Sequence, residues 1–406
     1  MTVTIDDIRA AAGVIAGQVV RTPAVPAPHL AEVTGAKAVV LKLECLQYTG
    51  SFKDRGALNK LTSLSAEEAK NGVIAMSAGN HAQGVACFAQ RLGIPATIVM
   101  PQGTPFTKVE RTRGFGARVV IEGDTIDSAA VFARDLAKRE NLTFVHPYDD
   151  PRIVAGQGTI GLELLADCPD LDSIVVPIGG GGIMAGIATA AKALKPAIEM
   201  IGVEAALYPS MHHAIRNLPP VFGAQTIAEG IAVKSPGALT KAIIERLVAD
   251  ILLVQEEPLE CAVQMLAERQ KIVAEGAGAA GLAALLAYPE RFAGKRVGLV
   301  ICGGNIDARM LGQVLLRGLV RDGRVVSLRI EISDSPGVLG KLARAIGEAG
   351  GNIIEIYHQR LFTDLPAKRA DVDAVIETRN AEHVKEIIAS LAAAGFTVRQ
   401  LGSRSI

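Results

Sequence analysis

The sequence predicts an α/β protein built on mostly parallel sheets, followed by a small, separate α+β domain. Short β-branched runs alternate with amphipathic helical stretches over about 300 residues, as is typical of parallel sheets covered by helices. Glycine-rich motifs follow several expected strands, where such sheets bind their ligands. After Gly323 the pattern changes, and strands and helices follow one another in the order βαββαβ.

In the first region the expected elements come in a regular order. Strands are expected at residues 38–43, 73–77, 96–100, 118–122, 173–178, 200–204, 251–255 and 296–302. Helices are expected at residues 82–92, 125–140, 183–193, 259–273 and 307–318. Because a helix follows most strands, each crossover returns the chain in the same direction and both faces of the sheet are covered.

The second region is shorter and its strands alternate with two helices. Strands are expected at residues 325–332, 374–378 and 397–401, with a further strand after the turn at 350–354. Helices are expected at residues 339–349 and 381–394. We place the boundary near residues 321–324, which gives regions 1–322 and 325–406.

Composition and charge exclude several classes of protein. The chain has 406 residues, 42 basic and 42 acidic side chains, and only 4% aromatic residues, so neither a basic field nor stacking platforms for nucleic acid are expected. No apolar run reaches the roughly 18 residues that span a bilayer, so no membrane is expected as a partner. The five cysteines are scattered and the N-terminus is acidic, which indicates a cytoplasmic protein with reduced thiols.

The first chemical motif is Thr49-Gly-Ser-Phe-Lys-Asp-Arg-Gly-Ala57, which opens a helix after the strand at 38–43. A buried Lys53 near a helix start would have a lowered pKa, which suits an amine that forms imines. From this motif alone, an ordinary solvated lysine is the alternative interpretation.

Two further motifs follow strands and open helices. Ser77-Ala-Gly-Asn-His-Ala-Gln-Gly84 would offer free backbone N–H groups to a carboxylate, and a simple helix cap is the alternative. Gly179–Gly182 would leave amides free for a phosphate, and a structural turn is the alternative. The residue order of a nucleotide P-loop is absent, so the phosphate would belong to a smaller cofactor.

The fourth motif, Cys302-Gly-Gly-Asn-Ile-Asp307, indicates core packing when taken alone. In this order, however, the four motifs resemble those of the fold type II pyridoxal-phosphate enzymes, in the threonine/serine dehydratase branch, over residues 1 to about 320. Residues 325–402 resemble an ACT-type amino-acid-binding domain through Asp334-x-Pro-Gly-x-Leu339 and Gly351-Asn-Ile353. The resemblance implies two open, twisted, mostly parallel sheets, the smaller formed by about residues 50–150 within the larger region.

The same resemblance implies a role for each motif residue. Lys53 would form a Schiff base with pyridoxal phosphate and then move the Cα proton of an amino-acid substrate. The other cofactor contacts would be Phe52 beside the ring, Asn80 at the 3-hydroxyl, Gly179, Gly180, Gly181 and Gly182 at the phosphate, and Cys302 at the pyridine nitrogen. The loop for the substrate carboxylate would comprise Ser77, Ala78, Gly79 and His81.

The implied activity is deamination of L-threonine to 2-oxobutanoate and ammonia, with L-serine as a second substrate. A thiol protonates a pyridine nitrogen poorly, so Cys302 favours β-elimination. Racemisation is disfavoured because Ala78 stands where serine racemases of this group carry a serine. β-Replacement is disfavoured by His81 after the asparagine, and a non-catalytic amino-acid sensor would have no use for Lys53.

The ACT resemblance implies an amino-acid effector, with isoleucine as the candidate from the branched-chain pathway, and a homo-oligomer, either a tetramer or a dimer. The effector residues would be Asp334, Pro336, Gly337, Leu339 and Asn352. No metal site is assigned: Glu204 matches a cation-binding glutamate of some relatives, but Ser210 stands where their aspartate would be. Glu275 is interpreted either as a helix cap or as part of a monovalent-cation site, and both remain open.

Overall fold

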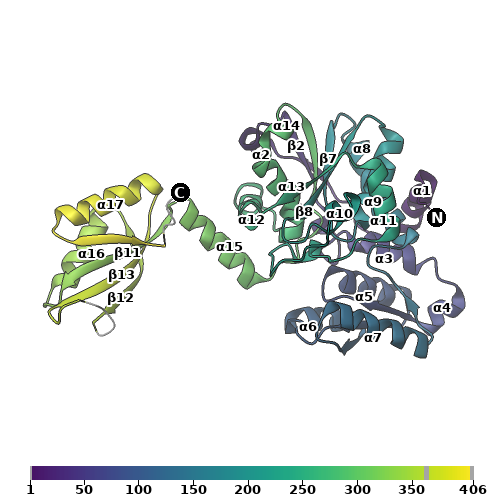
Figure 1. Cartoon of the computed structure of the whole chain (residues 1–406), viewed down its shortest axis with the longest axis horizontal. Coiled ribbons are helices and arrows are strands. Elements are labelled where there is room, and N and C mark those ends of the chain that lie inside the picture. Colours follow the sequence, from purple (N-terminus) through teal and green to yellow (C-terminus); the bar gives the residue numbers. More distant parts are fainter. Residues whose placement is uncertain (1, 361–364, 403–406) are drawn as a thin grey trace. The chain divides into compact units, whose positions relative to one another are not determined.

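The computed structural model describes residues 2–360 and 365–402, and the chain divides into two compact units (Figure 1). The first comprises Met1–Ile306 and the second Asp307–Ile406. This division falls earlier in the chain than the boundary expected near residues 321–324. The reason is that helix α15 (Ala308–Arg321) groups with the second unit, where it contacts strand β11 (Val325–Ser333).

A six-stranded sheet forms the centre of the first unit. Its order is β1-β2-β10-β7-β8-β9, and all neighbours are parallel except β1 and β2. The strands are β1 Ala24–Pro26, β2 Ala38–Lys42, β7 Ser173–Pro177, β8 Glu199–Ala205, β9 Asp250–Val254 and β10 Arg296–Val300. Strand β7 is buried along its whole length, as expected of a central strand with helices on both faces.

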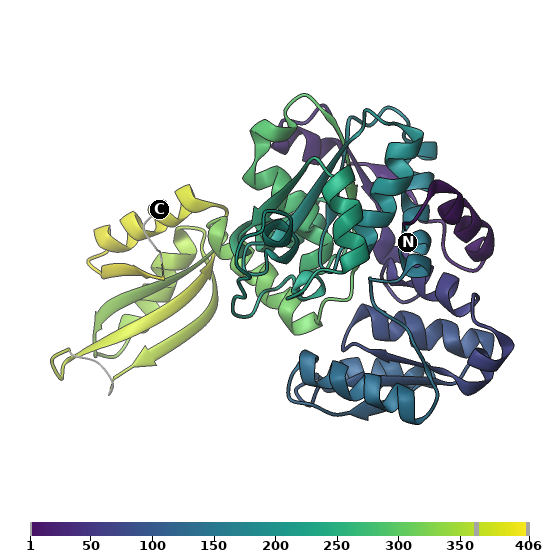
Figure 2. The same ribbon diagram turned by 45° about the vertical axis from the view of Figure 1, so that its right-hand side comes forward.

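A second, four-stranded parallel sheet has the order β5-β4-β3-β6. Its strands are β3 Val73–Met76, β4 Ala96–Met100, β5 Arg118–Ile121 and β6 Thr143–Phe144, and its helices are α5 Asn80–Leu92, α6 Phe106–Gly114 and α7 Ile126–Arg139. Ala75 and Ile98 pack in the core that contains α5, whereas Ile74 and Val99 face the core that contains α7. Figure 2 shows this sheet and its helices as a layered group beside the larger sheet, which confirms the predicted fold class.

The first unit has further helices, several of which the sequence pattern does not predict. They are α1 Ile5–Ile15, α2 Pro28–Thr34, α3 Lys53–Leu61, α4 Ala66–Asn71, α8 Pro151–Asp167, α9 Gly182–Leu194, α10 Ser210–Ile215, α11 Ala238–Leu247, α12 Glu256–Gln270, α13 Gly276–Ala287 and α14 Pro289–Phe292, with 3-10 turns η1 Glu44–Leu46 and η2 Glu229–Ile231. The expected helix at 259–273 ends at Gln270, because Lys271 adopts a left-handed conformation with φ 58°. In the described part of the chain, no helix is both long enough and apolar enough to cross a bilayer.

Helix α8 lacks a strong sequence signal because glycines, which are poor helix formers, occupy the face on which it packs. A side-chain carbon at Gly158 would lie only 3.0 Å from the carbonyl oxygen of Gly186 in α9. One at Gly161 would lie 3.1 Å from the carbonyl oxygen of Ile187. The glycines therefore allow the backbones of α8 and α9 to approach each other closely.

The second unit is an antiparallel sheet of order β12-β13-β11-β14 with two helices. Its other elements are β12 Asn352–Gln359, β13 Arg369–Glu377, β14 Thr397–Leu401, α16 Val338–Glu348 and α17 Ala381–Ala393. Buried and half-buried residues alternate along β11, so one face of the sheet packs against the helices. The predicted βαββαβ order is confirmed.

Candidate active site

Lys53 is the first residue of α3, and its amine lies within the first unit. The backbone N–H of Phe52 donates to the carbonyl oxygen of Cys302 at 3.0 Å, which ties the start of α3 to the carboxyl end of β10. Lys53 Nζ donates to the carbonyl oxygen of Pro147 at 2.7 Å. Burial lowers the pKa of Lys53 to about 8. A useful fraction of the amine is therefore neutral and nucleophilic near neutral pH.

Buried charges hold the first turn of α3 in place. Arg55 is fully buried and forms ion pairs with Glu44 and Glu163 at 2.8 and 2.7 Å. Asp54 accepts hydrogen bonds from both the backbone N–H and the hydroxyl of Thr49, and burial raises the pKa of Asp54 to about 6. Moving the start of α3 would break these ion pairs and leave a buried charge without a partner, which is energetically costly. The buried groups therefore hold the helix start in place. The sequence motif contains Arg55 and Asp54 but gives no sign of this role.

The asparagine loop connects β3 with α5. Residues 77–79 are half-buried, and the Ser77 hydroxyl accepts a hydrogen bond from the Gly79 backbone N–H at 3.1 Å. His81 is instead buried, with Nε2 3.0 Å from the carbonyl oxygen of Val145, and burial lowers the pKa of His81 to about 3. His81 is therefore a neutral interior side chain, and a direct contact between this side chain and a substrate carboxylate stays a prediction.

The glycine loop lies between β7 and α9. Gly181 adopts a positive φ of 94°, and no described residue accepts a hydrogen bond from the backbone N–H groups of Gly179–Gly182. The loop is also tightly packed against its neighbours. A side chain at Gly180 would collide with the ring of Tyr148. The Thr240 hydroxyl donates to the carbonyl oxygen of Gly180 at 2.7 Å. A loop that is held in place by its neighbours and has free backbone N–H groups at a helix start is suited to binding a phosphate.

The segment after β6 supplies a contact that the sequence pattern does not predict. The carboxylate of Asp149 accepts backbone N–H bonds from the first three residues of α11, at 3.0, 3.0 and 3.2 Å. Since Thr240 of α11 binds the glycine loop, Asp149 supports that loop indirectly. The partners lie about 90 residues apart in the chain, so no local motif could indicate the contact.

Polar side chains meet near the carboxyl end of β10. Cys302 is 3% exposed, and burial together with nearby Glu275 raises the pKa of its thiol well above the ordinary value. Asn80 Nδ2 donates to Glu275 Oε1 at 2.7 Å, and Asn305 Nδ2 donates to Asn80 Oδ1 at 2.8 Å. The structure thus brings the predicted Lys53, Asn80 and Cys302 into one region, together with Asn305, to which the motifs assign no role.

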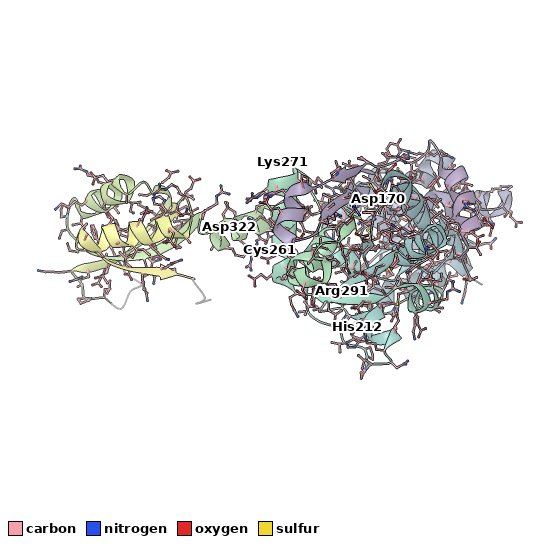
Figure 3. The ribbon with its side chains drawn as sticks, turned by 90° about the horizontal axis from the view of Figure 1, so that it is seen from above. Asp170, His212, Cys261, Lys271, Arg291 and Asp322 are labelled. Carbon is pink, nitrogen blue, oxygen red and sulfur yellow. The ribbon has the colours of Figure 1, made fainter. Side chains whose placement is uncertain are left out.

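Glu204 acts as a helix cap in this structure. Its carboxylate accepts backbone N–H bonds from Met211 at 2.8 Å and His212 at 2.9 Å in α10, and burial raises the pKa of Glu204 to about 7. Figure 3 shows the side chain of His212 at the edge of the first unit. Among the described residues, no group of three or more His, Cys, Asp or Glu side chains is arranged to hold a metal ion.

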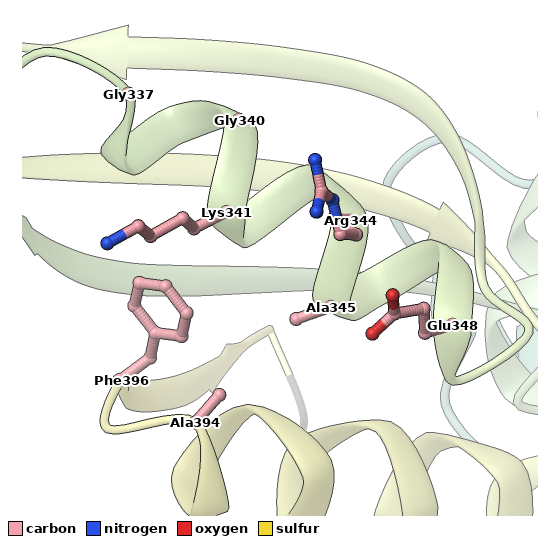
Figure 4. Close-up of a pocket in the computed structure, with 8 residues that line it drawn as sticks. All are labelled: Gly337, Gly340, Lys341, Arg344, Ala345, Glu348, Ala394 and Phe396. Carbon is pink, nitrogen blue, oxygen red and sulfur yellow. The ribbon is translucent and has the colours of Figure 1, made fainter.

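The predicted effector residues lie in three places of the second unit. Asp334, Pro336 and Gly337 lie in the loop between β11 and α16, Leu339 lies in the first turn of α16, and Asn352 is the first residue of β12. Asp334 pairs with Arg360 at 3.0 Å, Asn352 Nδ2 donates to Glu377 at 3.0 Å, and Gly337 adopts a positive φ of 85° before α16. A cavity of about 500 Å³ lies along α16 (Figure 4). Its lining comprises Gly337, Gly340, Lys341, Arg344, Ala345, Glu348, Ala394 and Phe396, so it shares one residue with the predicted effector set.

Comparison with known protein families identifies both units. The family model described as pyridoxal-phosphate dependent enzyme matches residues 15–303. The chain belongs to this family of pyridoxal-phosphate-dependent enzymes. The ACT domain model matches residues 326–393. Both family resemblances inferred from the motifs are therefore confirmed.

Individual proteins that are similar to this chain include ammonia-lyases and racemases. A protein named L-threonine ammonia-lyase from Thermotoga maritima is 44% identical over 402 residues, covering 98% of this chain and 100% of the relative. A crystal structure of threonine deaminase from T.th. superposes with a TM-score of 0.71 and 39% identity, covering 75% of this chain and 99% of that one. Maize serine racemase superposes with a TM-score of 0.72 and 33% identity, covering 79% and 99%.

The residues present fit the cofactor of the family. Lys53 would hold the aldehyde end, and the free amides of Gly179–Gly182 would hold the phosphate. The Phe52 ring, whose centroid lies 5.0 Å from Lys53 Nζ, would border the cofactor ring. The neutral Cys302 thiol and the Asn80 amide are the groups that we assign to the pyridine nitrogen and the 3-hydroxyl.

Proposed function

We propose that this pyridoxal-phosphate-dependent enzyme is a threonine ammonia-lyase that converts L-threonine to 2-oxobutanoate and ammonia and also turns over L-serine to pyruvate. The observation that carries the proposal is the buried amine of Lys53, located in a chain that aligns over 98% of its length with a protein of that name. The alignment spans both units, so the similarity includes the ACT domain as well as the catalytic unit.

The chain's own residues divide the chemistry among them. Bound pyridoxal phosphate supplies an electron sink for the charge that develops at the substrate Cα. Lys53, with its pKa lowered to about 8, can accept the Cα proton near neutral pH. The half-buried loop at residues 77–79, together with the helix start that follows it, would bind the substrate carboxylate. The neutral Cys302 thiol does not reinforce the electron sink, which favours rapid loss of the β-hydroxyl.

Racemisation is the second candidate, because two serine racemases superpose on 79% and 76% of this chain at 33% identity. Ala78 carries no transferable proton, however, and cannot serve as an acid or base on the opposite face of the substrate. Chiral analysis of unreacted L-serine decides between them: a lyase leaves the remaining serine in the L form, whereas a racemase accumulates D-serine.

Two other classes are less favoured by the residues. β-Replacement would require turnover of O-acetylserine with sulfide, and the Ser77-Ala-Gly-Asn-His81 loop differs from the threonine-rich loop of that branch. A non-catalytic sensor would bind an amino acid without consuming it, and the lowered pKa of Lys53 has no purpose in a sensor. Assays for cysteine and for 2-oxo acid formation separate these classes from a lyase.

The second unit contains an ACT domain, and ACT domains are a family that binds amino acids. We infer that an amino acid, with isoleucine as the candidate, binds there and alters turnover, and that the chain forms a homo-oligomer, either a tetramer or a dimer. The effector residues Asp334, Pro336, Gly337, Leu339 and Asn352 stay predictions, as do the cytoplasmic location and a monovalent cation.

Replacement of Lys53 tests the catalytic proposal directly. Lys53→Ala removes both the covalent attachment and the proton acceptor, so we expect loss of the visible absorbance of the bound cofactor and a fall of roughly 10³-fold or more in 2-oxobutanoate formation. Lys70→Ala, at an exposed lysine in α4, is the matched control and should behave like the wild type. Turnover of L-threonine by Lys53→Ala at more than a tenth of the wild-type rate would refute the assignment.

A further inference from the structure

Glu275 has a contact that its position in the fold does not require. It stands immediately before the first residue of α13, where a carboxylate ordinarily caps the helix, yet its side chain makes no capping hydrogen bond. Glu275 Oε1 instead accepts a hydrogen bond from Asn80 Nδ2 at 2.7 Å, across 195 residues of sequence. The carboxylate thus serves the asparagine loop rather than its own helix.

A chain of hydrogen bonds gives the Asn80 amide a single orientation. The carbonyl oxygen of Thr49 can only accept, so it fixes the direction in which Asn305 Nδ2 donates, at 2.7 Å. Asn305 Nδ2 then donates its second hydrogen to Asn80 Oδ1 at 2.8 Å, and Asn80 Nδ2 donates to Glu275. Turning the Asn80 amide over would place its NH2 group against the NH2 group of Asn305, so that two donors would face each other with no acceptor between them. This argument holds whether or not Glu275 is protonated, and burial raises the pKa of Glu275 to about 7.

The network leaves one donor of Asn80 uncommitted. Its Nδ2 carries two hydrogens, and within the described chain one goes to Glu275 while no other residue accepts the second. The Thr49 end of the network lies in the loop that leads directly to Lys53. The orientation of the free donor is therefore coupled to the segment that carries the reactive amine.

Two glycines leave the space that the Glu275 carboxylate occupies. A side-chain carbon at Gly303 would lie 2.5 Å from Glu275 Oε1, and one at Gly230 would lie 3.3 Å away. The backbone N–H of Glu275 also donates to the carbonyl oxygen of Gly303 at 3.1 Å. Gly303, which follows Cys302, thus leaves the space that the Glu275 carboxylate occupies.

We propose that Glu275 is a positioning residue for cofactor binding, which acts through Asn80 by directing one amide N–H of that side chain toward the cofactor's 3-hydroxyl oxygen. This inference rests on the proposed active site, and it adds a role that a helix cap or a cation ligand would not have. The requirement is a hydrogen-bond acceptor at Glu275 rather than a negative charge, since an amide oxygen in the same place would orient Asn80 equally well.

Titration of cofactor-free protein with pyridoxal phosphate, followed by visible absorbance, tests the proposal without using turnover. Glu275→Ala should weaken cofactor affinity by up to about tenfold, the net size of one hydrogen bond. Asn80→Ala should weaken it by a similar factor, and the double variant should be no weaker than Asn80→Ala, because Glu275 acts only through that side chain. Effects that multiply in the double variant would overturn the proposal.

Two further variants keep the test decisive if an alanine variant folds poorly. Glu275→Gln retains an acceptor and should bind the cofactor within about threefold of the wild type, and equal loss in Glu275→Gln and Glu275→Ala would overturn the acceptor role. Asn305→Ala, like Glu275→Ala, should weaken the affinity for the cofactor. Glu199→Ala is the control, since Glu199 pairs with Arg291 and Lys295 at the amino end of β8 and should leave cofactor affinity unchanged. Normal cofactor binding without threonine turnover would count against the proposed activity and leave this inference intact.

Discussion

At the scale of single residues, burial of one amine affects stability as well as chemistry. The pKa of Lys53 is about 8 in the folded protein, against an ordinary value of 10.5. Between these two pH values the unfolded chain binds more protons at this group than the folded chain does. The free energy of unfolding therefore rises with pH across that window, and below about pH 8 the folded protein carries the full cost of a buried ammonium group.

Lys53→Met in the cofactor-free protein should remove this contribution. We expect the variant to exceed the wild type in unfolding free energy near pH 7.5, and the difference to shrink towards pH 10 as the wild-type amine loses its proton. Urea unfolding of both proteins at the two pH values measures it. A difference that does not change with pH would contradict the lowered pKa.

Candidate site residues could be picked out from the sequence where one short motif contains them, and their roles stay predictions. Lys53 and Gly181 lie in motifs whose residue types and order already indicate an amine and a phosphate loop. Asp149 gives no such signal, because its partners in α11 lie about 90 residues later. The contact between Asn80 and Glu275 joins residues 195 positions apart, and only the folded chain brings them together.

At the scale of elements, the strands were easier to predict than the helices. Buried parallel strands are compact β-branched runs, and β4 was expected at the residues where it forms. The two-residue strand β6 is too short to leave a pattern. Helix α8 is hidden because glycines form its contact face, and glycine indicates turns in a sequence far more often than it indicates helix packing.

The close packing of α8 and α9 makes Gly186 sensitive to one added methyl group. A side-chain carbon there would lie 2.6 Å from the backbone nitrogen of Gly158 and would press on the carbonyl oxygen of Val154. We expect Gly186→Ala to lower the free energy of unfolding by about 1–3 kcal/mol. Gly13→Ala in α1, where the new carbon meets open space, should raise it by about 0.5–1 kcal/mol. Urea unfolding compares them, and a gain in stability for Gly186→Ala would contradict the packing argument.

At the scale of the whole molecule, the chain consists of two units with separate cores. The change of pattern after Gly323 revealed the second unit in the sequence. The compact division falls before α15 rather than after it, because α15 contacts β11 of the second unit, and this contact between elements is visible only in the folded chain. A solved threonine deaminase aligns with 75% of this chain and with 99% of its own.

A chain that ends at Ile306 should therefore keep its chemistry and lose its regulation. We expect threonine turnover within about threefold of the full chain, and no change of rate on addition of isoleucine, because the ACT domain is absent. Steady-state rates with and without isoleucine measure both effects, and L-lysine serves as the control amino acid. A truncated chain that still responds to isoleucine would place the effector site in the first unit.

The glycine contacts of α8 also set the separation between Lys53 and the glycine loop, the two places that we propose to hold the ends of the cofactor. Gly156 meets the main chain of α3 at Gly56, three residues beyond the amine of Lys53, while Gly158 meets the main chain of α9, which begins at the phosphate loop. Helix α8 thus acts as a spacer of fixed width, because main-chain contacts cannot relax by changing a rotamer. We therefore expect substitutions among the large apolar side chains to change the thermal stability of the protein more than they change this spacing, as long as the glycines remain.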